Sequence, residues 1–258
     1  MKSIWNSFKV AFAMFSKIPM PRADWTEENM RYMFCWLPFV GTVIGALSIG
    51  IFKAGQYFNF RHDFLSAILV LVPVAVTGGI HIDGLLDTAD ALSSWQERKR
   101  RLEILKDTHT GAFAVITACV YFLAWYGAYS QIGENTKAIY VMGCGFMVSR
   151  CFAGMSVLSL PKAKADGTVA EFSRNSSHRP VKRVLFVMLT ILLAVMVWID
   201  PVCGAAAFVA AGLVFLYSRH MIMKYFGGMT GDLAGYSICL SEIVMALVLA
   251  VVSNFTGV

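Results

Sequence analysis

The sequence predicts an all-α, polytopic integral membrane protein: a bundle of about seven transmembrane helices preceded by an N-terminal interfacial helix. Of its 258 residues, 57% are hydrophobic and only 15% are charged, and the mean hydropathy is +0.63. Soluble domains carry roughly 25% charged residues. The apolar residues gather in runs that are long enough to cross a hydrocarbon core of ~30 Å. We therefore expect a single membrane-embedded catalytic domain over residues 1–258.

Residues 3–17 precede the first apolar run and have an amphipathic pattern. A helix over this segment would present large apolar side chains on one side, namely Ile4, Phe8, Phe12 and Phe15. This pattern is typical of a helix that lies in the membrane interface. Pro19 and Pro21 follow and cannot continue the helix, so we expect it to end there.

Seven apolar runs follow, at residues 34–52, 64–81, 111–131, 138–160, 184–199, 202–218 and 236–253. Pro73 is expected to kink the second span. The fifth and sixth runs are short and joined by Asp200-Pro201, which predicts a tight helical hairpin. Gly41 and Gly45 form a G-x-x-x-G pattern that allows another helix to approach closely.

The positive charges predict how the spans are oriented. Eighteen of the 22 lysines and arginines fall in the segments that lie inside if the N-terminus is cytoplasmic, and only Lys53, Arg61 and Lys137 fall outside. This bias follows the positive-inside rule. We expect a multi-pass protein of the bacterial cytoplasmic (inner) membrane with a cytoplasmic N-terminus and active site and an outer C-terminus. The net charge of +6 is then explained by this bias and by contact with anionic lipid in the bilayer, not by nucleic acid.

An acidic stripe follows the second span. Asp83, Asp87 and Asp90 are spaced i, i+4 and i+7, which places them on one face of a helix, and His81 lies beside them. Three like charges this close need a cation between them. Oxygen ligands without cysteine favour Mg²⁺ or Mn²⁺, which typically bridges phosphate oxygens. One of the aspartates or His81 is expected to act as the catalytic base.

Three further groups could take part in this chemistry. Asp107 stands at the start of the third span, where exposed helix N–H groups bind anions. Arg150 lies inside the fourth span and needs a partner, either Glu242 or a substrate phosphate. The glycine-rich block around Thr230, Gly231 and Asp232 would supply the second wall of a metal–phosphate site, with Asp232 as a further metal ligand. The loop 161–183 is basic, and it either closes over substrate or faces lipid.

These blocks, in this order, resemble the cobalamin synthase family, the adenosylcobinamide-GDP ribazoletransferases. The family pattern G-G-x-H-x-D-G-L-x-D-T-x-D matches residues 78–90. Further matches extend the resemblance over nearly the whole chain: Pro19, Pro21, Arg31, Pro38, Gly41, Asp107, Gly111, Ser149, Arg150, Gly228, Thr230, Gly231, Asp232, Gly235 and Glu242. The chain departs from the family at His109, Cys239 and Lys17, the last standing where the family often has arginine.

The resemblance implies the last assembly step of the cobalamin nucleotide loop. Adenosylcobinamide-GDP would react with α-ribazole, or with α-ribazole 5′-phosphate, to give adenosylcobalamin or its phosphate and GMP, with Mg²⁺ present. Lys17 and Arg31 join Asp107, Arg150, Thr230 and Gly231 as expected substrate-binding residues. Association into a homo-oligomer is left open.

Two other classes are alternatives. CDP-alcohol phosphotransferases also place spaced aspartates at a membrane helix end, but their D-G-x-x-A-R run is absent, since Leu85-Leu86-Asp87-Thr88 follows Asp83-Gly84. A transporter with Arg150 and Glu242 as an ion relay would predict internal repeats and acids near the membrane midplane. The sequence has no evident repeat, and its acids gather at one face.

Overall fold

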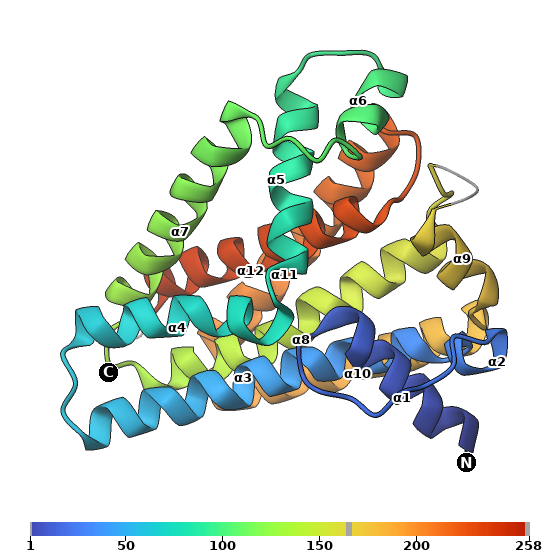
Figure 1. Ribbon diagram of the computed structural model, residues 1–258. Helices are drawn as coiled ribbons and strands as arrows, with labels where there is room; N and C mark the ends of the chain where they lie inside the picture. Colours follow the sequence, from blue (N-terminus) through green and yellow to red (C-terminus); the bar gives the residue numbers. More distant parts are fainter. Residues whose placement is uncertain (1, 164–166, 256–258) are drawn as a thin grey trace.

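The computed structural model describes residues 2–163 and 167–255, and all regular structure in this part of the chain is helical (Figure 1). The twelve helices are α1 (Lys2–Phe15), α2 (Glu27–Met30), α3 (Met33–Tyr57), α4 (His62–Thr77), α5 (Ile80–Ser93), α6 (Arg98–Ile104), α7 (Ala112–Ile132), α8 (Thr136–Ser159), α9 (Thr168–Asn175), α10 (His178–Ile199), α11 (Pro201–Tyr225) and α12 (Gly231–Val252). The only β-type pairing among these residues is an isolated bridge between Lys162 and Met229.

Six helices are long and apolar enough to cross a membrane by themselves: α3, α7, α8, α10, α11 and α12. A seventh candidate span is the pair α4 and α5, which passes the same test together but bends by 96° at its break. The chain is therefore a multi-pass membrane protein, and the all-α bundle predicted from its composition is confirmed.

Helices α8 and α12 form the centre of the bundle. Most of the span window of α8 is buried inside the protein, whereas α7 and α10 expose most of theirs. α3 makes its most extensive contact with α8, and α12 contacts α5, α7, α8 and α11. The close contact of α3 with α8 depends on Gly45, because a Cβ placed there would lie 2.5 Å from the carbonyl oxygen of Gly143. The predicted close approach at Gly41 and Gly45 is thus confirmed.

The structure adds one detail to the helix prediction and changes another. Pro73 lies inside α4, and a sharp bend follows the end of that helix at Gly78 and Gly79, which both have positive φ (65° and 82°). The fifth and sixth runs are not short, since α10 and α11 extend past the apolar stretches into basic residues. The predicted hairpin between them is present: the Asp200 side chain caps α11 by accepting hydrogen bonds from the N–H groups of Val202 and Cys203.

The N-terminal helix α1 packs on the start of α3. The ring of Phe8 lies edge-on to that of Trp36, with centroids 5.3 Å apart, and Phe12 is buried. Ile4 and Trp5 remain exposed. One apolar face is therefore covered by protein, and the exposed aromatic group fits the interfacial position predicted from the sequence.

Candidate active site

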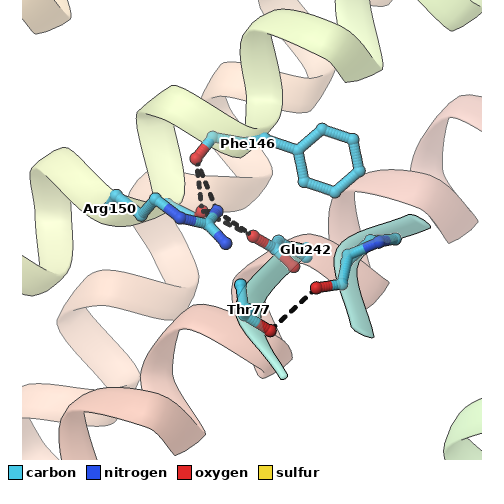
Figure 2. Close-up of polar contacts among 6 residues, drawn as sticks. Thr77, Phe146, Arg150 and Glu242 are labelled. Carbon is cyan, nitrogen blue, oxygen red and sulfur yellow. Dashed lines mark hydrogen bonds and ion pairs between the residues drawn. The ribbon is translucent and has the colours of Figure 1, made fainter. Parts of the chain in front are cut away.

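The bend between α4 and α5 is built by local chemistry at residues 77–79. Gly78 ends α4 in the left-handed conformation and donates its N–H to the carbonyl of Val74 at 2.7 Å. The Thr77 hydroxyl donates to the carbonyl of Pro73 at 2.7 Å, as Figure 2 shows, and accepts from the N–H of Gly79. Only glycine adopts two successive positive-φ conformations without strain. The bend turns α5 away from the direction of α4.

Helix α5 then crosses α12 in the antiparallel sense. The backbone of Gly84 touches that of Asp232, since a Cβ on Gly84 would lie 2.5 Å from the Asp232 carbonyl oxygen. Three residues earlier on α5, His81 lies against Gly235 in the same way. This glycine-mediated contact brings the first turn of α5 beside the first turn of α12.

A cavity of about 420 Å³ opens at this crossing. Five of the residues predicted for the site line it: His81, Asp83, Thr230, Gly231 and Asp232. The sequence placed these residues in two blocks almost 150 positions apart, and the structure joins the blocks at one cavity. The prediction that Asp232 faces the acidic stripe is therefore supported by the geometry.

Asp87 continues the stripe one turn beyond Asp83 and is half-buried. It lies within electrostatic range of the carboxylates of Asp83, Asp232 and Asp90. These four acids form the predicted cluster, but Asp87 and Asp90 do not line the cavity.

Asp90 has a structural contact that the sequence did not reveal. Its two carboxylate oxygens accept hydrogen bonds from the N–H groups of Gly111 (2.7 Å) and Ala114 (2.8 Å) at the start of α7. Asp90 thereby caps α7 from a neighbouring helix, and a negative charge is stabilising at that helix end. This contact gives Asp90 a role apart from the metal binding predicted for it.

The acids fit a magnesium ion only in part. Within residues 2–163 and 167–255, no group of three His, Cys, Asp or Glu side chains comes together as a complete ligand set. Mg²⁺ usually takes one or two carboxylates, with waters and substrate phosphates completing its octahedron. Asp83 and Asp232, with Asp87 close by, fit that open arrangement and do not form a closed structural site.

Asp107 lies outside the cavity. Its carboxylate accepts hydrogen bonds from the backbone N–H (3.0 Å) and the ring Nδ1 (2.7 Å) of His109. These hydrogen bonds lower the pKa of Asp107, so the carboxylate stays ionised to lower pH than an ordinary aspartate. The structure does not bring Asp107 to the cavity lining.

Arg150 is paired with Glu242 in the protein interior. Its Nη1 lies 2.5 Å from Oε1 of Glu242, and the two side chains are 1% and 3% exposed (Figure 2). Nη1 also donates to the carbonyl of Phe146, and Ser149 donates to the same Glu242 oxygen. Of the two partners considered for Arg150, the structure selects Glu242. Arg150 does not line the cavity, so the prediction that it binds substrate loses its geometric basis.

Lys17 and Arg31 also serve local contacts. The aliphatic chain of Lys17 covers Gly78, and its N–H donates to the carbonyl of Val76 at 2.8 Å. The guanidinium of Arg31 donates to the Ser177 hydroxyl at 2.9 Å, which ties the start of α3 to the start of α10. Both side chains are exposed and neither lines the cavity.

The structure adds one residue that the sequence did not single out. Lys106, just after α6, is the only lysine or arginine among the described residues that line the cavity. Two cations of the same segment are used differently: Arg98 donates to the carbonyl of Met223, and Arg101 lies 4.7 Å over the ring of Tyr225. These contacts dock α6 on the end of α11.

The predicted loop 161–183 contains a helix that forms part of the cavity wall. Val169, Ala170 and Phe172 of α9 line the cavity, and the ring of Phe172 stacks on Trp25 with centroids 5.8 Å apart. Before α9, the chain pairs with Met229, next to Thr230. Residues 164–166 of this loop lie outside the described residues. Of the two roles considered, cover over the cavity agrees with the position of α9.

The fold and the site define a polytopic membrane protein with an acidic cavity where its central helix α12 begins. The family model described as cobalamin-5-phosphate synthase matches residues 7–250. The chain belongs to that family, and the resemblance read from the motifs is confirmed. The family match leaves the phospholipid synthase and transporter alternatives without support.

Curated relatives carry a consistent name. An adenosylcobinamide-GDP ribazoletransferase of Lachnoclostridium phytofermentans is 37% identical over 95% of this chain and 94% of its own length. Proteins of the same name from Geobacillus thermodenitrificans and Clostridium botulinum are 34% and 28% identical, and the alignments cover 91% or more of each chain. No solved structure matches the chain significantly.

Proposed function

We propose that this protein is the adenosylcobinamide-GDP ribazoletransferase of a cobalamin pathway. It transfers the cobinamide phosphate of adenosylcobinamide-GDP to α-ribazole or α-ribazole 5′-phosphate and releases GMP. The observation that carries the proposal is the meeting of Asp83 and Asp232 at one cavity, in a chain whose relatives bear this name.

In this reaction a ribose hydroxyl attacks the phosphorus that is joined to the cobinamide arm. A new P–O bond forms to the ribose, the P–O bond to GMP breaks, and the hydroxyl proton passes to a base. His81 and Asp83 line the cavity and are the favoured bases, whereas Asp87 lies one turn further along α5.

The polar end of the cavity suits a diphosphate. Thr230 caps α12, and its hydroxyl accepts from the N–H of Leu233, so the first N–H groups of a long helix point toward the site. Mg²⁺ held by Asp83, Asp232 and Asp87 would neutralise charge on the phosphate oxygens and on the departing GMP.

The proposed setting is the bacterial cytoplasmic membrane, with the N-terminus and the cavity on the cytoplasmic side. The cavity lies where α3 and α12 begin and α8 ends, which is one end of the bundle. The same end holds the basic segments of the chain, in line with the positive-inside rule.

The test is GMP release by the purified protein in lipid nanodiscs with adenosylcobinamide-GDP, α-ribazole 5′-phosphate and magnesium. Asp83→Asn and Asp232→Asn should each lower kcat by about 10²- to 10³-fold, the usual cost of losing one charge-stabilising group. Asp63→Asn is the matched control, because Asp63 is exposed and pairs with Arg61 at the far end of α4. Full activity of Asp83→Asn would refute the assignment.

A further inference from the structure

The cavity has walls of two kinds. Its polar side chains come from the start of α5, from residues 230–232 and from Lys106. Among the described residues, every other lining side chain is apolar or a glycine, and aromatic rings stand on several elements: Phe15 of α1, Phe34 of α3 and Phe172 of α9. A ligand that fills it must therefore have an apolar part and a phosphate or hydroxyl part.

The volume limits what can enter. At about 420 Å³ the cavity is near the lower end of the ~300–1,000 Å³ range of small-molecule pockets. A corrin ring is much too large for it, but a nucleoside fits. A guanine base carries several donors and acceptors on its edge, and these would lie unpaired against the apolar wall, which is costly. The base of α-ribazole, a methylated benzimidazole, has no such row of donors and acceptors, and burial against the apolar wall stabilises it.

From these observations we propose that the cavity is the binding site of the acceptor riboside, and that Lys106 selects its 5′-phosphorylated form. The inference rests on the proposed function and deepens it. The benzimidazole of α-ribazole lies against the aromatic wall, and its ribose lies beside Asp83 and Asp232. Adenosylcobinamide-GDP approaches from outside, so that only its diphosphate reaches the polar end.

Lys106 lies where the 5′-phosphate of a bound riboside would be. It is exposed and yet lines the cavity, so it lies at the mouth. A riboside that is buried base-first points its 5′ carbon outward, toward the ammonium group. A lysine there binds a phosphate as a compact point charge and leaves an unphosphorylated riboside without a matching partner.

The first test fills the cavity from α9. Val169 lies across from the start of α12, with its Cγ2 3.6 Å from the position of a Cβ on Gly231. Val169→Trp should raise the KM for α-ribazole by about tenfold or more, since small changes in an apolar pocket cost ~10- to 200-fold. The KM for adenosylcobinamide-GDP should stay within about twofold. Val187→Trp, on the exposed face of α10, is the matched control. A rise in the KM for adenosylcobinamide-GDP alone would overturn the proposal and assign the cavity to guanosine.

The second test compares Lys106→Gln with Lys99→Gln, an exposed lysine of the same segment that does not line the cavity. Lys106→Gln should lower kcat/KM for α-ribazole 5′-phosphate by about tenfold, which corresponds to ~1.4 kcal/mol. It should leave kcat/KM for α-ribazole unchanged. Equal losses for the two acceptors would refute selection by Lys106.

A binding measurement separates this inference from the proposed function. α-Ribazole alone should raise the unfolding temperature of the wild-type protein, and it should not raise that of Val169→Trp. If this pattern appears without GMP release under any condition, the cavity assignment stands and the proposed reaction fails. If GMP is released but the riboside stabilises neither protein and both KM values are unaffected by Val169→Trp, the reaction stands and the cavity assignment fails.

Discussion

Single residues in this protein divide into those that face the cavity and those that hold the helices that form it. Asp83 and Asp232 belong to the first group. Asp90 belongs to the second, because both of its oxygens are used by backbone N–H groups of α7. All three are aspartates near a helix end, and the sequence pattern alone gave them the same role. Their difference lies in what the rest of the fold brings to each carboxylate.

The buried pair of Arg150 and Glu242 gives a prediction at this scale. Glu242→Gln leaves the guanidinium without its counter-charge in the interior, which should cost about 3–5 kcal/mol of unfolding free energy. The double variant Arg150→Met with Glu242→Leu removes both charges and should recover most of that loss. Thermal unfolding in detergent measures both effects.

The same double variant tests whether Arg150 has any part in catalysis. We expect it to keep GMP release near the wild-type rate, because neither side chain lines the cavity. A variant that unfolds at the wild-type temperature but releases no GMP would contradict the purely structural role of the pair.

At the scale of helices, the site depends on the crossing of α5 and α12. Gly84→Ala would place a methyl group 2.5 Å from the Asp232 carbonyl oxygen, so the two backbones must separate. We expect a loss of about 1–3 kcal/mol from overpacking. Activity should fall further than stability suggests, since a displacement of ~1 Å can cost 10²-fold in rate.

The control for this variant is Gly127→Ala on α7, where an added Cβ meets nothing within 4 Å. Its unfolding temperature and GMP release should match those of the wild type. Wild-type behaviour of Gly84→Ala in both measurements would show that the α5–α12 contact tolerates separation.

The sequence predicted the helices themselves better than it predicted the contacts between them. The spacing of Asp83, Asp87 and Asp90 fixes a common helix face whatever lies opposite, and the structure has α5 over Ile80–Ser93. The bend between α4 and α5 was not predicted, because two adjacent glycines reveal positive φ only once the backbone is known. The roles of Lys106 and Asp90 could not be predicted, since they depend on residues far away in the chain.

For the whole molecule, the arrangement predicts a fixed orientation in the membrane. In a cysteine-free background, Tyr57→Cys and Lys137→Cys should react with an impermeant maleimide in intact spheroplasts, because both positions are exposed near the far end of the bundle. Gln96→Cys and Lys99→Cys should react only after lysis. The reverse pattern would place the cavity on the outer side and contradict the proposed setting.

The 96° bend also has a consequence for how the chain is made. A membrane insertion machinery meets the 16 residues of α4 as a short apolar segment that ends at two glycines. An aspartate at the bilayer centre costs roughly 2.5–3.5 kcal/mol during insertion. In the proposed orientation, the acidic helix turns aside on the cytoplasmic side after the bend, so Asp83, Asp87 and Asp90 would stay in the compartment of the ribosome throughout synthesis. None of these three carboxylates would then have to pass through lipid during insertion.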